Sequence, residues 1–99
     1  MSPGCNSDAH ALVYQVLDQV LADKVVTAGT PRAIFTAIDT LRSSRAPVEQ
    51  VRKAEDISVQ IHKLQGALQQ SNALQADSVL ADLKNMAAQW LDIRIHAGH

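Results

Sequence analysis

Four stretches of the chain repeat apolar residues at intervals of three and four positions, and short polar or proline-containing segments separate them. This spacing places the apolar residues of each stretch on one side of an α-helix. The apolar positions are Leu12, Val13, Val16, Leu17, Val20 and Leu21; then Ile34, Ile38 and Leu41; then Val51, Ala54, Ile57, Ile61, Leu64 and Leu68; and finally Leu80, Leu83, Ala87, Trp90 and Leu91. The pattern predicts four amphipathic helices.

Residues typical of helix starts precede these stretches. Ser7 is expected to cap the first helix, since its hydroxyl can accept a hydrogen bond from the first turn. Thr30 is expected to cap the second, with Pro31 at the first helical position, where the missing N–H is harmless. Pro47 is expected to open the third helix in the same way. A turn over residues 69–73 then leads to the last helix.

The chain has 99 residues, which is the length of one domain. No alternating run of β-branched residues indicates a strand. Residues 1–7 read as a flexible leader, and residues 8–97 as a single helical domain. Because the connections between the helices are short, the sequence predicts an all-α fold in the form of an antiparallel four-helix up-and-down bundle.

Charge and cysteine content narrow the function classes. The formal net charge is −1, from nine basic and ten acidic side chains. The electrostatic potential of such a chain does not favour binding to nucleic acid or to a membrane surface. Cys5 is the only cysteine, which excludes an intramolecular disulfide and fits a reducing compartment. The sequence has no apolar run of membrane-spanning length and no signal-peptide pattern, so we expect a soluble, cytoplasmic protein.

The third stretch contains a histidine, His62, and a glycine one helical turn later, Gly66. Counting 100° per residue, His62 lies about 130° from the centre of the apolar stripe, so its imidazole should face water. Glycine in a helix interior costs about 1 kcal/mol relative to alanine. A neutral imidazole can act as a nucleophile, and a position without a side chain lets a partner approach closely. The pair therefore marks a candidate site.

Residues 62–67, HKLQGA, resemble the signature of histidine-containing phosphotransfer (Hpt) domains, which reads His-x-Leu-Lys-Gly followed by small residues. The resemblance implies a four-helix bundle in which His62 accepts a phosphoryl group from an aspartyl phosphate of a receiver domain and passes it on. It also implies that Leu64 is a buried anchor and that Gly66 leaves room for the receiver. Gln65 stands where the family has a lysine, and Lys63 or Arg52 would have to supply the cation instead. Leu68 stands where the family has a small residue.

The other side chains expected to border this site are Glu55, Gln65 and Gln69, which lie on the same polar side of the helix. Lys63 is included as a binding residue for its charge, although helical spacing does not place it on that side. The plain alternative is that His62 is an ordinary surface residue and that Gly66 marks either a close helix contact or an early end of the third helix. Asp92 and His96 have metal-ligand spacing, and His99 follows, but two ligands near a chain end make a poor site, so we predict no metal and no cofactor.

No nucleophile–base pair, paired carboxylates or phosphate loop can be assembled, so autonomous catalysis is not expected. We expect a small regulatory or adaptor module that binds another protein, with histidine phosphotransfer through His62 as the alternative. The apolar face of the first helix is wider than one helix hairpin needs. This width permits a second buried surface that a homodimer or a partner helix would cover. If the first helix is the contact face, a charge at Val16 or Val20 should release the partner.

Overall fold

The computed structural model describes the backbone of residues 5–97 and the side chains of residues 8–92. Four α-helices account for nearly all of this length, and the described residues contain no strand. The helices are α1 (Cys5–Asp23), α2 (Gly29–Ser43), α3 (Val48–Gln69) and α4 (Ala73–Ala97). The predicted all-α class with four helices is confirmed. Among the described residues, no helix combines the length and the apolar character needed to cross a bilayer.

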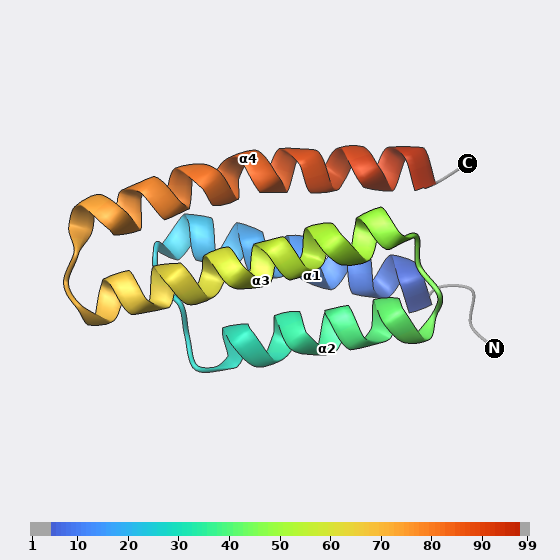
Figure 1. The fold of residues 1–99 in the computed structure, drawn as a ribbon, viewed down its shortest axis with the longest axis horizontal. Helices are drawn as coiled ribbons and strands as arrows, with labels where there is room; N and C mark the ends of the chain where they lie inside the picture. Colours follow the sequence, from blue (N-terminus) through green and yellow to red (C-terminus); the bar gives the residue numbers. More distant parts are fainter. Residues whose placement is uncertain (1–4, 98–99) are drawn as a thin grey trace.

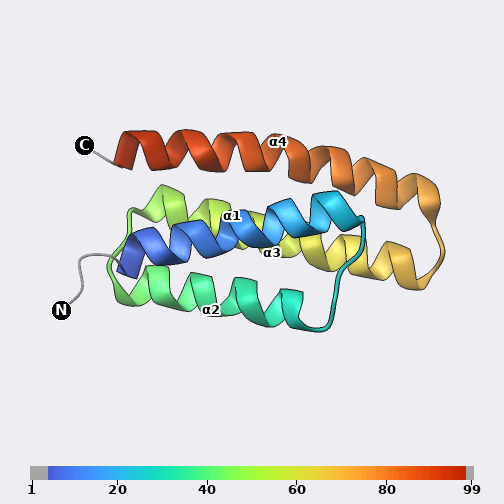
Figure 2. The same cartoon turned by 180° about the vertical axis from the view of Figure 1, so that it is seen from behind.

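Each helix packs against two others, since α1 and α3 both contact α2 and α4. In Figures 1 and 2 the chain turns back at each of its three connections, so the helices lie side by side along the long axis of the molecule. The apolar stripes of all four helices meet between them. The fully buried large apolar side chains are Val13, Leu17, Val20, Ile34, Leu41, Ile57, Ile61, Leu64, Leu83 and Trp90.

The wide apolar face of α1 is covered by the chain itself. Val16 and Val20 are both buried in the core, because α2 and α4 each pack on α1. The alternative in which these two residues form the contact face for a partner is therefore wrong. A charge at either position would disrupt the fold rather than release a bound protein.

Two helix starts differ from the sequence-based expectations. α1 begins at Cys5, so its first turn already includes residues 5–7 of the predicted leader, and Ser7 is not its cap. α2 begins at Gly29, with Thr30 inside its first turn. The Thr30 hydroxyl instead accepts a hydrogen bond from the backbone N–H of Thr27 (3.2 Å) and lies 2.9 Å from the Thr27 hydroxyl. It closes the connection that precedes the helix.

The other two helix starts lie within one residue of the expected positions. Pro47 directly precedes α3, and its carbonyl accepts backbone hydrogen bonds from Gln50 and Val51. Asn72 precedes α4, and its side-chain oxygen accepts a hydrogen bond from the backbone N–H of Gln75 (3.2 Å). This contact satisfies one of the donors that the first turn of a helix leaves open.

The α3–α4 hairpin is longer than the α1–α2 pair. At the connection between α3 and α4, the hairpin projects beyond the ends of α1 and α2 (Figures 1 and 2). Leu68, which the pattern placed in the core, is 36% exposed because it lies in this projecting part. We call residues 65–76 the hairpin tip. Within the tip, Ala67 and Ala76 are buried where the two helices meet.

Candidate functional site

His62 lies on the solvent-facing side of α3, as its position relative to the apolar stripe predicted. Its side chain is exposed, whereas Ile61 and Leu64 beside it in sequence are fully buried. The ring nitrogen Nδ1 is 2.8 Å from the backbone oxygen of Ser58, one turn earlier. A carbonyl oxygen only accepts hydrogen bonds, so Nδ1 must carry the proton that it donates. In the neutral ring the lone pair is then on Nε2.

Gly66 follows His62 by one turn and leaves an opening in the side-chain layer. It is part of the continuous helix α3, and no glycine among the described residues has a positive φ. A Cβ atom built at Gly66 would have no neighbouring heavy atom within 4 Å. Gly66 is therefore not needed for a backbone conformation or for a close helix contact within this chain. The alternative that it marks such a contact is wrong.

Helix α2 brings Phe35 to the same surface. The side chains of Arg42 on α2 and Glu55 on α3 form an ion pair across the seam between these helices. Seven residues are nearly two full turns, so Phe35 lies on the same side of α2 as Arg42, and His62 on the same side of α3 as Glu55. Because Figures 1 and 2 show α2 and α3 running in opposite directions, these two steps lead to the same level of the seam.

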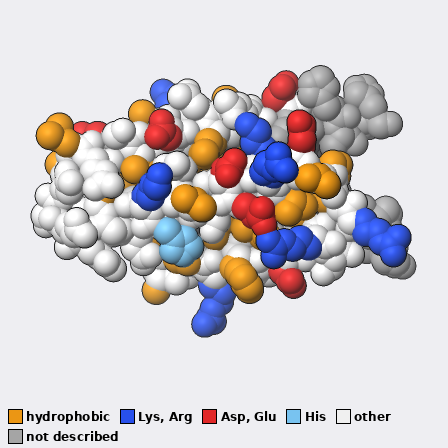
Figure 3. Space-filling model, in the orientation of Figure 1, with side chains coloured by type: hydrophobic (Ala, Val, Ile, Leu, Met, Phe, Trp, Pro, Cys, Tyr) orange, Lys and Arg blue, Asp and Glu red, His pale blue; other side chains and the backbone are white. Residues whose placement is uncertain are grey.

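The surface around this level is apolar as well as exposed. Phe35 is 69% exposed, and Val59, three residues before His62 on α3, is 52% exposed. Figure 3 shows a surface histidine with hydrophobic side chains near it, on the side of the molecule where α3 faces the viewer in Figure 1. We call the surface of Phe35, Val59, His62 and Gly66 the Phe35–His62 face. It combines a nucleophilic nitrogen with two apolar side chains that are mostly exposed to solvent.

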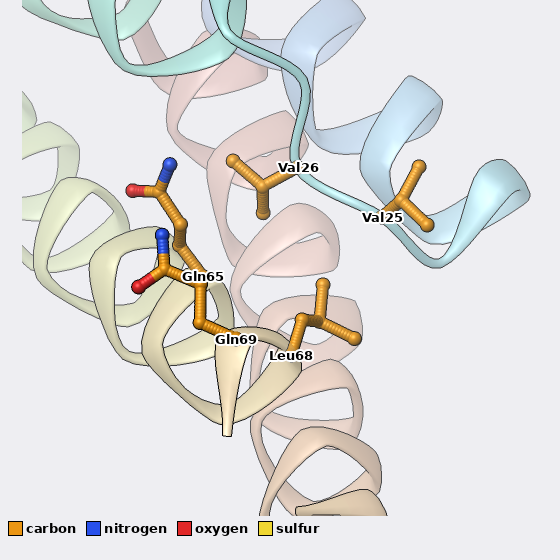
Figure 4. Close-up of a pocket in the computed structure, with 5 residues that line it drawn as sticks. All are labelled: Val25, Val26, Gln65, Leu68 and Gln69. Carbon is orange, nitrogen blue, oxygen red and sulfur yellow. The ribbon is translucent and has the colours of Figure 1, made fainter. Parts of the chain in front are cut away.

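The predicted binding residues are distributed around His62 in different ways. Lys63 is exposed on α3, and Glu55 is engaged by Arg42 two turns before His62, roughly 10 Å along the helix axis. Gln65 and Gln69 line a pocket of about 300 Å³ together with Val25, Val26 and Leu68. Figure 4 shows both glutamines on one wall of this pocket and the three apolar side chains around the rest. The structure thus brings Gln65 and Gln69 together, but not Glu55.

A second histidine, His10, is buried at the junction of α1, α3 and α4. Its ring stacks on the indole of Trp90, with centroids 4.3 Å apart and an angle of 13° between the planes. A hydrogen bond of 3.0 Å joins His10 Nδ1 to Gln50 Nε2, and the Trp90 indole N–H donates to the His10 carbonyl at 2.9 Å. These contacts join three helices.

Neither this buried cluster nor the outward position of Phe35 followed from the sequence pattern. His10 precedes Val13 and Leu17 by three and seven residues, and Gln50 precedes Ala54 and Ile57 by four and seven. The same helical spacing that predicted the core therefore includes both polar residues. Their polarity, not their position, kept them out of the predicted core.

The described residues contain no group of three or more histidine, cysteine, aspartate or glutamate side chains that could hold a metal ion. The side chains of His96 and His99, weighed as metal ligands with Asp92, lie outside the described residues. Comparisons of the chain with known protein families, with curated proteins and with solved structures gave no match.

Proposed function

We propose that this chain is a small helical regulatory or adaptor protein that acts in the cytoplasm by binding another protein through the Phe35–His62 face. The bundle is its rigid support, and we assign it the antiparallel up-and-down order. The reversal of the chain at each connection and the packing of each helix on two others support that order. No cofactor is part of the proposed function.

The observation that carries the proposal is the exposure of Phe35 beside His62. An exposed phenylalanine with 69% of its surface in water gains free energy when a partner covers it, at roughly 25 cal/mol per Å² of apolar surface. Aromatic residues are enriched at the centres of protein interfaces. Val59 lies on the adjacent face of α3 and extends the apolar surface, and Gly66 leaves room for a partner's backbone.

The test is a comparison of partners retained by the wild type and by two surface variants. Phe35→Glu places a charge in the centre of the face at a position where the core is not disturbed. Gln19→Glu is the matched control. Gln19 is exposed on α1, and α1 packs mainly against α2 and α4 rather than against α3. We expect a protein that binds the wild type and the control, and is lost with Phe35→Glu. If every retained protein also binds Phe35→Glu, this face is not the contact.

Histidine phosphotransfer is the second candidate, and the hydrogen bond of the imidazole favours it. Nδ1 donates to Ser58, so the neutral ring presents the Nε2 lone pair to solvent. In the proposed step, Nε2 attacks the phosphorus of an aspartyl phosphate on a receiver domain. The P–Nε2 bond forms, the P–O bond breaks, and the aspartate leaves as a carboxylate. The in-line geometry and the Mg²⁺ would come from the receiver.

This candidate makes a chemical prediction that the contact alone does not. Incubation with receiver domains charged by acetyl phosphate should give a phosphorylated chain whose label is labile in acid and stable in base. The label should be absent in His62→Gln. Binding of the same receiver without any label would leave the adaptor function and exclude phosphotransfer.

A further inference from the structure

Most of the hairpin tip is exposed, and its outer residues have no role in the core or in the Phe35–His62 face. Eight consecutive residues, Leu68 to Gln75, are exposed. Leu74 is 85% exposed at the start of α4 and is the most exposed large apolar side chain among the described residues. Val25 follows the end of α1 by two residues and lies next to the tip, and it is 47% exposed. Because they are exposed, these side chains add little to the free energy of unfolding.

Two hollows flank the tip and share Leu68. One is the pocket of about 300 Å³ that includes Val25 and Gln65 (Figure 4). The other, of about 170 Å³, lies at the turn between α3 and α4 and includes Ala73 and Ala76. Protruding leucines and shallow apolar hollows therefore occur on the same small surface. This combination suits a contact between two like surfaces, in which each gives a protrusion and receives one.

The charge pattern selects the kind of partner. Residues 65–76 contain no aspartate, glutamate, lysine, arginine or histidine, although the chain has 19 acidic and basic residues in 99. In Figure 3 the end of the molecule formed by the tip is mostly white and orange. A surface with charges of one sign repels a second copy of itself, whereas an uncharged surface does not. An uncharged surface also offers no electrostatic attraction to a charged partner.

The polar side chains of the tip also favour a second copy of this chain as the partner. Its side chains include four glutamines and one asparagine. A side-chain amide has both a donor and an acceptor, so it can pair with an identical amide, which a carboxylate or an ammonium group cannot do. Such groups satisfy the symmetry of a two-fold interface, where the same patch is present on both sides.

We propose that the hairpin tip is the contact surface of a homodimer, in which the tips of two copies pack against each other around Leu68 and Leu74. The contact is centred on Leu68 and Leu74, which are not part of the Phe35–His62 face, although Gly66 belongs to both surfaces. It does not depend on the function proposed for that face. The exposed segment of eight residues is small beside the roughly 20 to 30 residues per side of a standard interface. The dimer is therefore weak and depends on protein concentration.

The first test is sedimentation velocity over a range of roughly 5 to 500 µM, which covers weak association. The mass of the wild type should rise from 10.7 kDa toward twice that value. Leu74→Glu should remain a monomer over the whole range. Because Leu74 is so exposed, this variant should keep the thermal unfolding midpoint of the wild type. Val48→Glu is the matched control, since Val48 is 72% exposed at the opposite end of α3, and it should still dimerise.

The second test asks whether the same tip comes from both copies. Gln70→Lys and Gln70→Glu each place one charge at the turn, so each variant alone should dimerise less than the wild type, and added salt should reduce the loss. An equal mixture of the two should associate more strongly than either alone. The proposal is overturned if the wild type stays monomeric at every concentration, if Leu74→Glu dimerises as well as the wild type, or if the mixture shows no gain.

Discussion

Replacement of Gly66 by alanine separates what the fold needs from what a partner needs. Gly66 lies within α3, has a helical backbone, and has open space where a Cβ would stand. In a helix interior, glycine is less favourable than alanine by about 0.8 to 1.0 kcal/mol, because it loses more backbone entropy on folding. No clash offsets this gain. We therefore expect Gly66→Ala to raise the free energy of unfolding by about 1 kcal/mol.

The expected shift is large enough to measure. A chain of this size unfolds with an entropy of about 0.2 kcal/mol per kelvin near its midpoint, so 1 kcal/mol corresponds to a rise in Tm of about 5 °C. In urea, with an m-value of about 2 kcal/mol/M, the midpoint should rise by about 0.5 M. Circular dichroism at the helix band follows both transitions.

Two variants serve as controls for this prediction. Gly29→Ala adds a methyl group with equally open space, but at the first residue of α2, where helix propensity counts for less, so its gain should be well below that of Gly66→Ala. Ala88→Gly, at an exposed position within α4, should lower the free energy of unfolding by about 1 kcal/mol. A loss of stability in Gly66→Ala would show that the opening beside His62 is filled in solution.

The same variant also bears on function. If Gly66 provides clearance for a bound protein, Gly66→Ala should be more stable than the wild type and yet bind the partner of the Phe35–His62 face less tightly. This opposition of stability and binding is expected for a residue kept for contact rather than for folding. Equal binding by both proteins would remove Gly66 from the contact.

The remaining predictions concern buried and surface polar contacts, and chemical denaturation measures each of them. Trp90→Phe removes the indole donor to the His10 carbonyl and leaves part of the fully buried ring volume unfilled, so it should cost about 1 to 3 kcal/mol. His10→Ala and Gln50→Ala should each destabilise the fold, with a coupling of about 1 kcal/mol in a double-mutant cycle; additive effects would contradict the bond between them. Arg42→Gln should cost less than about 1 kcal/mol, because its pair with Glu55 is solvent-exposed. A larger loss that persists in high salt would refute this.

The sequence pattern predicted the four helices and most of the core because helical periodicity is a local property. Ile57, Ile61 and Leu64 lie on one side of α3 whatever the other helices do, and His62 is on another side for the same geometric reason. Pro47 likewise stands directly before α3, because proline lacks the N–H that a helix interior requires. These features follow from residue order and bond geometry.

The parts of the candidate site that depend on other helices were not predictable in this way. The placement of Phe35 beside His62 requires the relative direction and register of α2 and α3, which the contact between Arg42 and Glu55 reveals. The burial of Val16 likewise depends on two helices that pack on α1 at once.

The sequence by itself determined which residues can face inward on each helix, and it marked the histidine and glycine on the outer side of α3. Only the tertiary structure decided which of the remaining surfaces are covered. It buried His10 and Gln50 by giving them each other and Trp90 as partners, and it left Leu68 and Leu74 in water. The physical reason is that burial is a property of the space between elements, which depends on their lengths and packing rather than on the periodicity of any one of them.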